Sequence, residues 1–199
     1  MDDDAECAEL DLSDLVAEGA VWRRRRLVRC RLRGADLREL VTEQCVFDEC
    51  DLTGADLGDS RHRGTAFRTC MLRGATLSGS AFHGCSLLGT VLVDARLRPW
   101  TVSDCDLTLA ALGGTDLRRT DLSGLRLREA DFGGADLRES DLRGADLAGA
   151  RLLRTRLEDA DLRGARLDPD ALVQARLTGA RVDPETALAF AAAHGLRIG

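Results

Sequence analysis

The sequence predicts an all-β solenoid, in which the 199-residue chain winds into stacked coils around one continuous core. Two observations lead to this prediction. An apolar residue recurs at every fifth position from Leu12 to Val182 without a change of phase, and only Thr42 and His62 in this series are polar. A second series, two residues earlier, consists mostly of Ala, Cys, Ser and Thr. Each five-residue unit therefore carries one large and one small side chain for the core.

A period of five fits neither a helix nor a straight strand. On an α-helix each step of five turns the side chain by about 140°, which would spread the apolar residues around the whole helix. In a straight strand an odd step reverses the face of the sheet. A short extended piece followed by a corner places both series inside the coil. Glycine recurs two residues after the leucine, as at Gly34 and Gly144, where a tight corner favours a residue without Cβ.

Composition and charge argue against several classes of protein. All 28 basic residues are arginine, so the chain has no P-loop, kinase-type or Schiff-base lysine, and it has no tyrosine. We therefore expect no enzyme. The net charge of −6 argues against a nucleic-acid binder, and we expect no direct contact with nucleic acid.

The chain also lacks the patterns of a membrane or exported protein. No apolar run approaches the roughly 20 residues of a membrane span. The first 20 residues hold eight acidic and no basic side chains, the opposite of a signal peptide. We expect a cytoplasmic protein without membrane contact.

The seven cysteines and three histidines fit the repeat better than they fit a metal or redox site. Six cysteines take the small inward position, where they replace alanine as small buried hydrophobes, and none has the paired spacing of a zinc site. His62 takes a leucine position and is expected to be a hydrogen-bonded core residue, whereas His83 is expected to point outward. No calcium loop and no Ser–His–Asp arrangement stands out. We expect no cofactor and no metal.

The five-residue phase ends at Asp183, which divides the chain into a repeat region, 1–183, and a C-terminal region, 184–199. Asp183 is the expected N-cap of a helix that begins at Pro184, runs to His194 and stops at Gly195. This helix is too apolar to be isolated and exposed. Because the open end of a solenoid needs a cover, we expect the helix to cap the last coil.

Pro99 and Trp100 mark a second irregularity. Trp100 falls where the core requires a small side chain, and Pro99 removes one donor between coils. We expect a local fault in the stack here, at which the coil bulges, kinks or turns the indole ring outward.

The tandem units "ADLRG" and "ADLAG" resemble the pentapeptide-repeat proteins over residues 11–183. This resemblance implies a right-handed quadrilateral β-helix with four pentapeptides per coil, hence about nine coils and a rod of about 40 Å. Qnr proteins carry loops that interrupt their repeats, whereas the phase here is unbroken. A narrower resemblance is to MfpA-type fluoroquinolone-resistance proteins, and it lies in the segments "DSRHRG" from Asp59, "RLRPWTVSDCDLTLAALGG" from Arg96, "DLRGARLDP" from Asp161 and "AFAAAHGL" from Ala189.

The resemblance implies a DNA-mimicking protein that binds DNA gyrase, modulates or inhibits supercoiling, and protects against quinolone-type poisons. It also implies a homodimer joined through the C-terminal helix, with contacts expected at Ala187, Leu188, Phe190, Ala191, Leu196 and Ile198. With a repeat of 20, the most acidic face is the expected gyrase-binding surface, although it also holds eight arginines that would pair with the acids. Its acidic residues are Asp36, Glu39, Asp56, Asp59, Asp116, Asp136, Glu139, Glu158 and Asp159.

Two other functions stay open. The chain could be a self-immunity protein against an endogenous gyrase inhibitor, which would share the target but not the drug. It could also be a scaffold protein unrelated to gyrase, because a fold does not fix a function.

Overall fold

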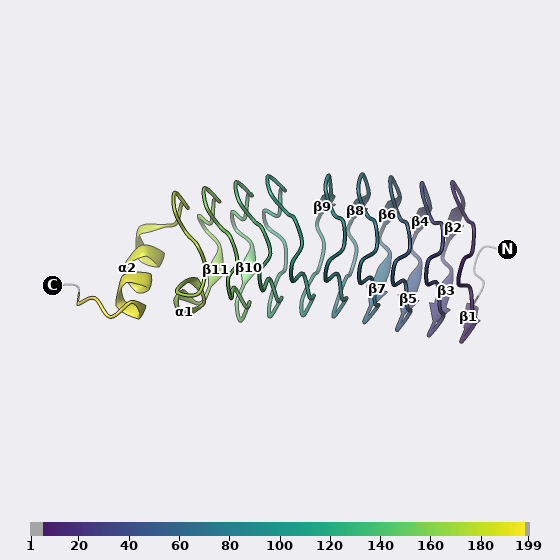
Figure 1. The fold of residues 1–199 in the computed structure, drawn as a ribbon, viewed down its shortest axis with the longest axis horizontal. Helices are drawn as coiled ribbons and strands as arrows, with labels where there is room; N and C mark the ends of the chain where they lie inside the picture. The colour runs from purple at the N-terminus through teal and green to yellow at the C-terminus, as the bar shows by residue number, and fades with distance from the viewer. Residues whose placement is uncertain (1–5, 198–199) are drawn as a thin grey trace.

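The computed structural model describes residues 6–197 and confirms a parallel β-solenoid with a short C-terminal helix. Its strand pairs are parallel and join residues 20 apart, as in Trp22 with Thr42 and Thr42 with His62. Isolated bridges continue this register as far as Asp161 with Arg181. Four five-residue units therefore complete one coil, which confirms the four-sided rod. In Figure 1 the purple N-terminal coils and the yellow C-terminal helix lie at opposite ends of the rod.

The regular elements are short because the chain turns a corner after every unit. The bounds are β1 Glu6–Ala8, β2 Val21–Arg23, β3 Arg26–Val28, β4 Val41–Glu43, β5 Val46–Asp48, β6 Arg61–Arg63, β7 Ala66–Arg68, β8 Ala81–His83, β9 Thr101–Ser103, β10 Asp146–Leu147, β11 Arg166–Leu167, α1 Pro169–Leu172 and α2 Pro184–Ala193.

We number the four faces of the rod in chain order within each coil. Face 1 contains β1, β3, β5, β7, β10 and β11, and face 4 contains β2, β4, β6, β8 and β9. Face 2 contains the units that bridge through Asp11, Arg31 and Asp51, and face 3 contains those that bridge through Asp36 and Asp56.

The core is a column of leucines with small residues between them. Leu37 and Leu137 are fully buried, and so are the small side chains of Cys45 and Ala135. Each leucine removed from water in this way contributes about 1.5–3 kcal/mol. Both five-residue series therefore point inward, as the sequence predicts.

The corner residue, two positions after the central one, adopts a left-handed backbone. Its φ is 65° at Gly34 and 57° at Asp59. Asp, Glu, Arg and Thr also take this position, so the glycine that the sequence predicts there is favoured but not required. Gly79 is an exception, since its φ is 78° and a Cβ would collide with the carboxylate of Asp59 in the preceding coil.

The predicted fault at Pro99 and Trp100 is confirmed, but the indole ring points inward. Trp100 is 6% exposed, and its ring meets Phe82 edge-on with the centroids 5.9 Å apart. The indole Nε1–H has no hydrogen-bond partner among the described residues. The core accepts the large ring because the coils separate next to it.

This separation interrupts the stack on two adjacent faces. The bridges of Val91 with Ala111 and of Asp106 with Arg126 flank the fault. Between them, in the described chain, the units of Arg96 and Thr101 form no bridge to the units 20 residues later. Figure 1 shows the coil of β9 standing farther from the next coil along its upper edge.

Two helices replace the strands at the C-terminal end. Helix α1, which the five-residue pattern does not predict, takes a face-2 position and buries Leu172 in the core. The second helix, α2, ends one residue earlier than expected, and Asp183 takes the N-cap position without a side-chain cap. The Asp183 carboxylate instead accepts a hydrogen bond from the backbone N–H of Gly164. None of the helices within residues 6–197 has the length and apolar character to cross a membrane.

Candidate functional site

The nine acidic residues predicted for the gyrase-binding surface all lie on face 3. Bridges join Asp36 to Asp56 and Asp116 to Asp136. Glu39, Asp59, Glu139 and Asp159 occupy the corners of the same units, with φ between 56° and 60°. Glu158 and Asp159 follow Leu157, which lies one coil beyond Leu137. The fault divides this face into a group from Asp36 to Asp59 and a group from Asp116 to Asp159.

Several of these carboxylates pair with an arginine of their own strand. In Asp-Leu-Arg the acid and the base are two residues apart and therefore share a face. Arg38 Nη2 lies 2.7 Å from Asp36 Oδ2, and Arg118 Nη2 lies 2.6 Å from Asp116 Oδ2. The hydrogen bond from the Arg118 side chain holds the pKa of Asp116 well below its usual range. The repeated "DLR" was the sequence signal for these pairs.

Other pairs connect neighbouring coils. Arg119 Nε lies 2.8 Å from Glu139 Oε2 and lowers the pKa of that carboxyl. Asp136 receives Arg138 at 2.7 Å and Arg156 at 3.4 Å. Arg156 also lies 3.7 Å from Glu158. The C-terminal acidic group is therefore largely neutralised, and such exposed pairs contribute little to stability, about 0–1 kcal/mol each.

Four of the predicted acidic residues keep an unpaired charge. Within the described chain, no arginine lies within 4 Å of the carboxylates of Glu39, Asp56, Asp59 or Asp159. Asp56 is half-buried, and its Oδ1 accepts the backbone N–H of Gly58 at 2.9 Å. Three of the four lie together on two neighbouring coils of face 3. We call Glu39, Asp56 and Asp59 the acidic corner.

The C-terminal helix α2 presents an apolar surface that the rod does not cover. Leu188 is 52% exposed and Leu196 is 64% exposed. Ala187 is exposed, and Phe190 and Ala191 are half-buried. Ile198, also predicted for the dimer contact, lies outside the described residues.

Helix α2 covers the last coil incompletely. Phe190 packs against the edge of the core. A cavity of about 180 Å³ remains between α2 and the coil, lined by Leu172, Leu177, Ala180, Val182, Ala187 and Phe190.

The cysteines are packed as core residues. Six of them are buried, and their thiols lie near backbone carbonyls, as Cys45 Sγ does at 3.4 Å from the oxygen of Trp22. Burial raises the pKa of the Cys30 thiol, which disfavours the reactive thiolate. Residues 6–197 contain no cluster of three or more His, Cys, Asp or Glu side chains that could hold a metal ion.

Comparison with known proteins identifies the repeat. The family model for pentapeptide repeats matches residues 26–61, 50–89, 63–98, 105–144 and 140–168, which is more than half of the chain. No curated protein sequence matches the chain.

Two solved structures resemble the whole rod. Full-length QnrB1, described as a plasmid-mediated fluoroquinolone resistance protein, has a TM-score of 0.82 and 18% identity, with 96% of this chain and 98% of QnrB1 covered. A trypsin-treated variant of QnrB1 has a TM-score of 0.81 and 18% identity, with 98% of both chains covered. At this identity the likeness shows a common fold.

Proposed function

The chain belongs to the pentapeptide-repeat family, and we propose that it is a DNA-mimicking member that binds DNA gyrase. In this proposal it modulates or inhibits supercoiling and protects gyrase from quinolone-type poisons. The observation that supports it best is the likeness to QnrB1, a fluoroquinolone resistance protein, over 98% of both chains. The resemblance of four sequence segments to MfpA-type proteins supplies the partner, gyrase.

The acidic corner is the part of face 3 best suited to contact a DNA-binding surface. No arginine among residues 6–197 neutralises its three carboxylates, so their charge is available to cationic groups of a partner. The C-terminal acidic group would first have to release Arg118, Arg119, Arg138 and Arg156. Recognition of gyrase therefore depends on rod shape and a local acidic cluster more than on total charge.

A supercoiling assay with a matched pair of variants tests this proposal. Glu39→Lys, Asp56→Lys and Asp59→Lys together should weaken inhibition of gyrase about tenfold, because cationic side chains would face a cationic surface. The control combines Asp14→Lys, Glu49→Lys and Glu129→Lys, which change the net charge equally at corners of faces 1 and 2. This control should inhibit like the wild type.

The other possible results of this assay distinguish between the alternative contacts and functions. If the two triple variants lose inhibition equally, the attraction to gyrase is diffuse and the acidic corner is not a specific contact. Inhibition of supercoiling without protection against a quinolone would favour the self-immunity protein. If the wild-type protein neither inhibits supercoiling nor protects gyrase from a quinolone at any concentration, the result favours a scaffold protein unrelated to gyrase.

A further inference from the structure

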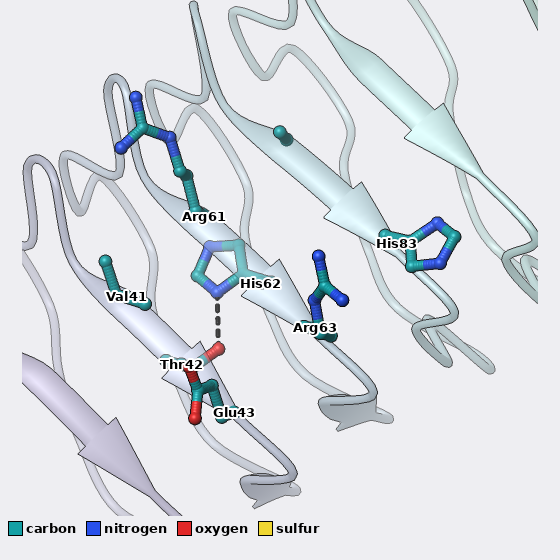
Figure 2. Close-up of a pocket in the computed structure, with 8 residues that line it drawn as sticks. Val41, Thr42, Glu43, Arg61, His62, Arg63 and His83 are labelled. Carbon is teal, nitrogen blue, oxygen red and sulfur yellow. Dashed lines mark hydrogen bonds between the residues drawn. The ribbon is translucent and has the colours of Figure 1, made fainter.

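A hollow of about 280 Å³ lies on face 4, whose lining units begin directly after Glu39 and Asp59 of the acidic corner. Strands β4, β6 and β8 form it, and its outward residues are Val41, Glu43, Arg61, Arg63, Ala81 and His83. In Figure 2 Arg61 and Arg63 lie on either side of His62, and His83 lies on the neighbouring strand beyond Arg63. The side chains of Val41 and Ala81, one coil to each side of Arg61, are small and uncharged.

Arg61 and Arg63 differ from most arginines of this face because no acid of the described chain neutralises them. Arg143 lies within hydrogen-bond distance of Asp141, and Arg163 Nη2 lies 2.6 Å from Asp161 Oδ2. No described carboxylate lies within 4 Å of Arg61 or Arg63. Two unpaired guanidinium groups side by side are an arrangement that binds oxyanions.

The acidic groups nearest to the hollow interact with other residues, so Arg61 and Arg63 are free to bind a ligand. Glu43, the nearest acid in the lining, is engaged by Arg23 at 3.0 Å. His83 Nδ1 contacts Ser103 Oγ at 2.9 Å and lies 3.5 Å from Asp104. The carboxylate of Asp104 is therefore on the far side of His83 from Arg63.

The spacing of the two arginines selects the ligand. Residues two apart on a strand are separated by about 6.6 Å, and the side chain of His62, between the two arginines, is buried in the core. A ligand that fits carries two anionic groups joined by a short neutral segment. We propose that Arg61 and Arg63 bind consecutive phosphates of a polynucleotide strand that crosses face 4 along β6, with the intervening sugar over the backbone of His62.

This proposal departs from the expectation based on net charge, because the charge is not spread evenly. On the first coils, face 3 carries Glu18, Asp36, Glu39, Asp56 and Asp59, and only Arg38 opposes them. Face 4 of the same coils carries Glu43 as its only acid among the outward residues from Val21 to Gly84. The rod therefore has an anionic and a cationic flank, and the site does not depend on the gyrase proposal.

Fluorescence anisotropy with a labelled single-stranded DNA 12-mer at low salt tests the site. We expect binding whose log K falls with log salt with a slope of about −1.4, the value for two phosphate contacts on a single strand. Arg61→Gln with Arg63→Gln should weaken binding at least tenfold. The control, Arg143→Gln with Arg163→Gln, removes the same charge from the same face at ion-paired positions and should bind like the wild type.

Three results would overturn the proposal. One is the absence of DNA binding at low salt. The second is equal weakening in both double variants, which would indicate diffuse attraction. The third is equal displacement of the DNA by poly-glutamate or by inorganic phosphate, which would indicate a general anion site. If Arg61→Gln with Arg63→Gln unfolds, the single variants Arg61→Gln and Arg63→Gln decide instead, since each removes one phosphate contact and should reduce the salt slope from about −1.4 to about −0.7. An unchanged slope in both would also overturn the proposal.

Discussion

At the scale of single residues, the buried polar side chains of the core form a hydrogen-bonded group around His62. Its Nδ1 lies 2.7 Å from Thr42 Oγ1, and its Nε2 lies 2.9 Å from Ser60 Oγ. Thr42 Oγ1 also contacts Thr65 Oγ1 at 2.9 Å. His62 is 2% exposed, so the expectation of a hydrogen-bonded core residue is confirmed.

This histidine makes the stability of the rod depend on pH. Burial lowers the pKa of His62 from 6.5 to about 3. Between these values the unfolded chain binds a proton that the folded chain does not, so stability is complete above pH 6.5 and falls as the pH falls towards 3. The expected loss is about 1.4 kcal/mol per pH unit, or about 2 kcal/mol at pH 5.

Urea unfolding at pH 7 and pH 5 measures this loss. His62→Phe should remove most of the difference between the two pH values, whereas His83→Asn, at an exposed histidine, should keep it. Equal pH dependence in the wild type and His62→Phe would contradict the assignment.

At the scale of elements, the repeat was predictable and its interruptions were only partly so. The five-residue phase identified Leu37, Cys45 and Leu137 as core residues because a periodic pattern requires one repeated environment. It could not show that Trp100 points inward, since that depends on how far neighbouring coils separate. It could not show α1 either, because Leu172 keeps the phase of a strand.

The sequence predicted where the acidic residues of the candidate site lie, but not which of them pair with arginines. The 20-residue register placed the nine acidic residues on one face, which follows from the repeat alone. Whether each acid is neutralised depends on side-chain contacts between coils, as between Arg119 and Glu139. The acidic corner therefore emerged only from the structure.

The exposed apolar side chains of helix α2 predict that two copies of the chain form a dimer through this helix. Leu188→Glu with Phe190→Glu should convert a dimer into a folded monomer, because two charges would be buried in the contact at a cost on the order of 3 kcal/mol. Sedimentation velocity at micromolar concentration measures the change. Ala189→Glu with Ala193→Glu adds the same charge at exposed alanines about 100° and 140° around the helix from Leu188, so it is the control and should leave the proposed dimer intact.

The repeats should remain folded in both helix variants, because Phe190 touches only the edge of the core at the last coil and the other coils pack on one another. A wild-type chain that sediments as a monomer would rule out the paired rods. The helix would then serve only the last coil, against which Phe190 packs.

At the scale of the whole molecule, length is what makes a rod resemble DNA. One rod is about 40 Å long, and two joined through α2 would reach about 80 Å, or about 24 base pairs at 3.4 Å each. The net charge is only −6, so the proposed DNA mimicry would rest on shape together with the acidic corner. A monomer would present half of this length to gyrase.

Competition between this protein and DNA for gyrase tests the central claim most directly. A labelled duplex is bound to gyrase and the protein is titrated in. The account predicts that the duplex is displaced, that its apparent Kd rises in proportion to the protein concentration, and that added salt weakens the effect. Binding of the protein to gyrase with an unchanged Kd for the duplex, or no binding at all, would contradict it.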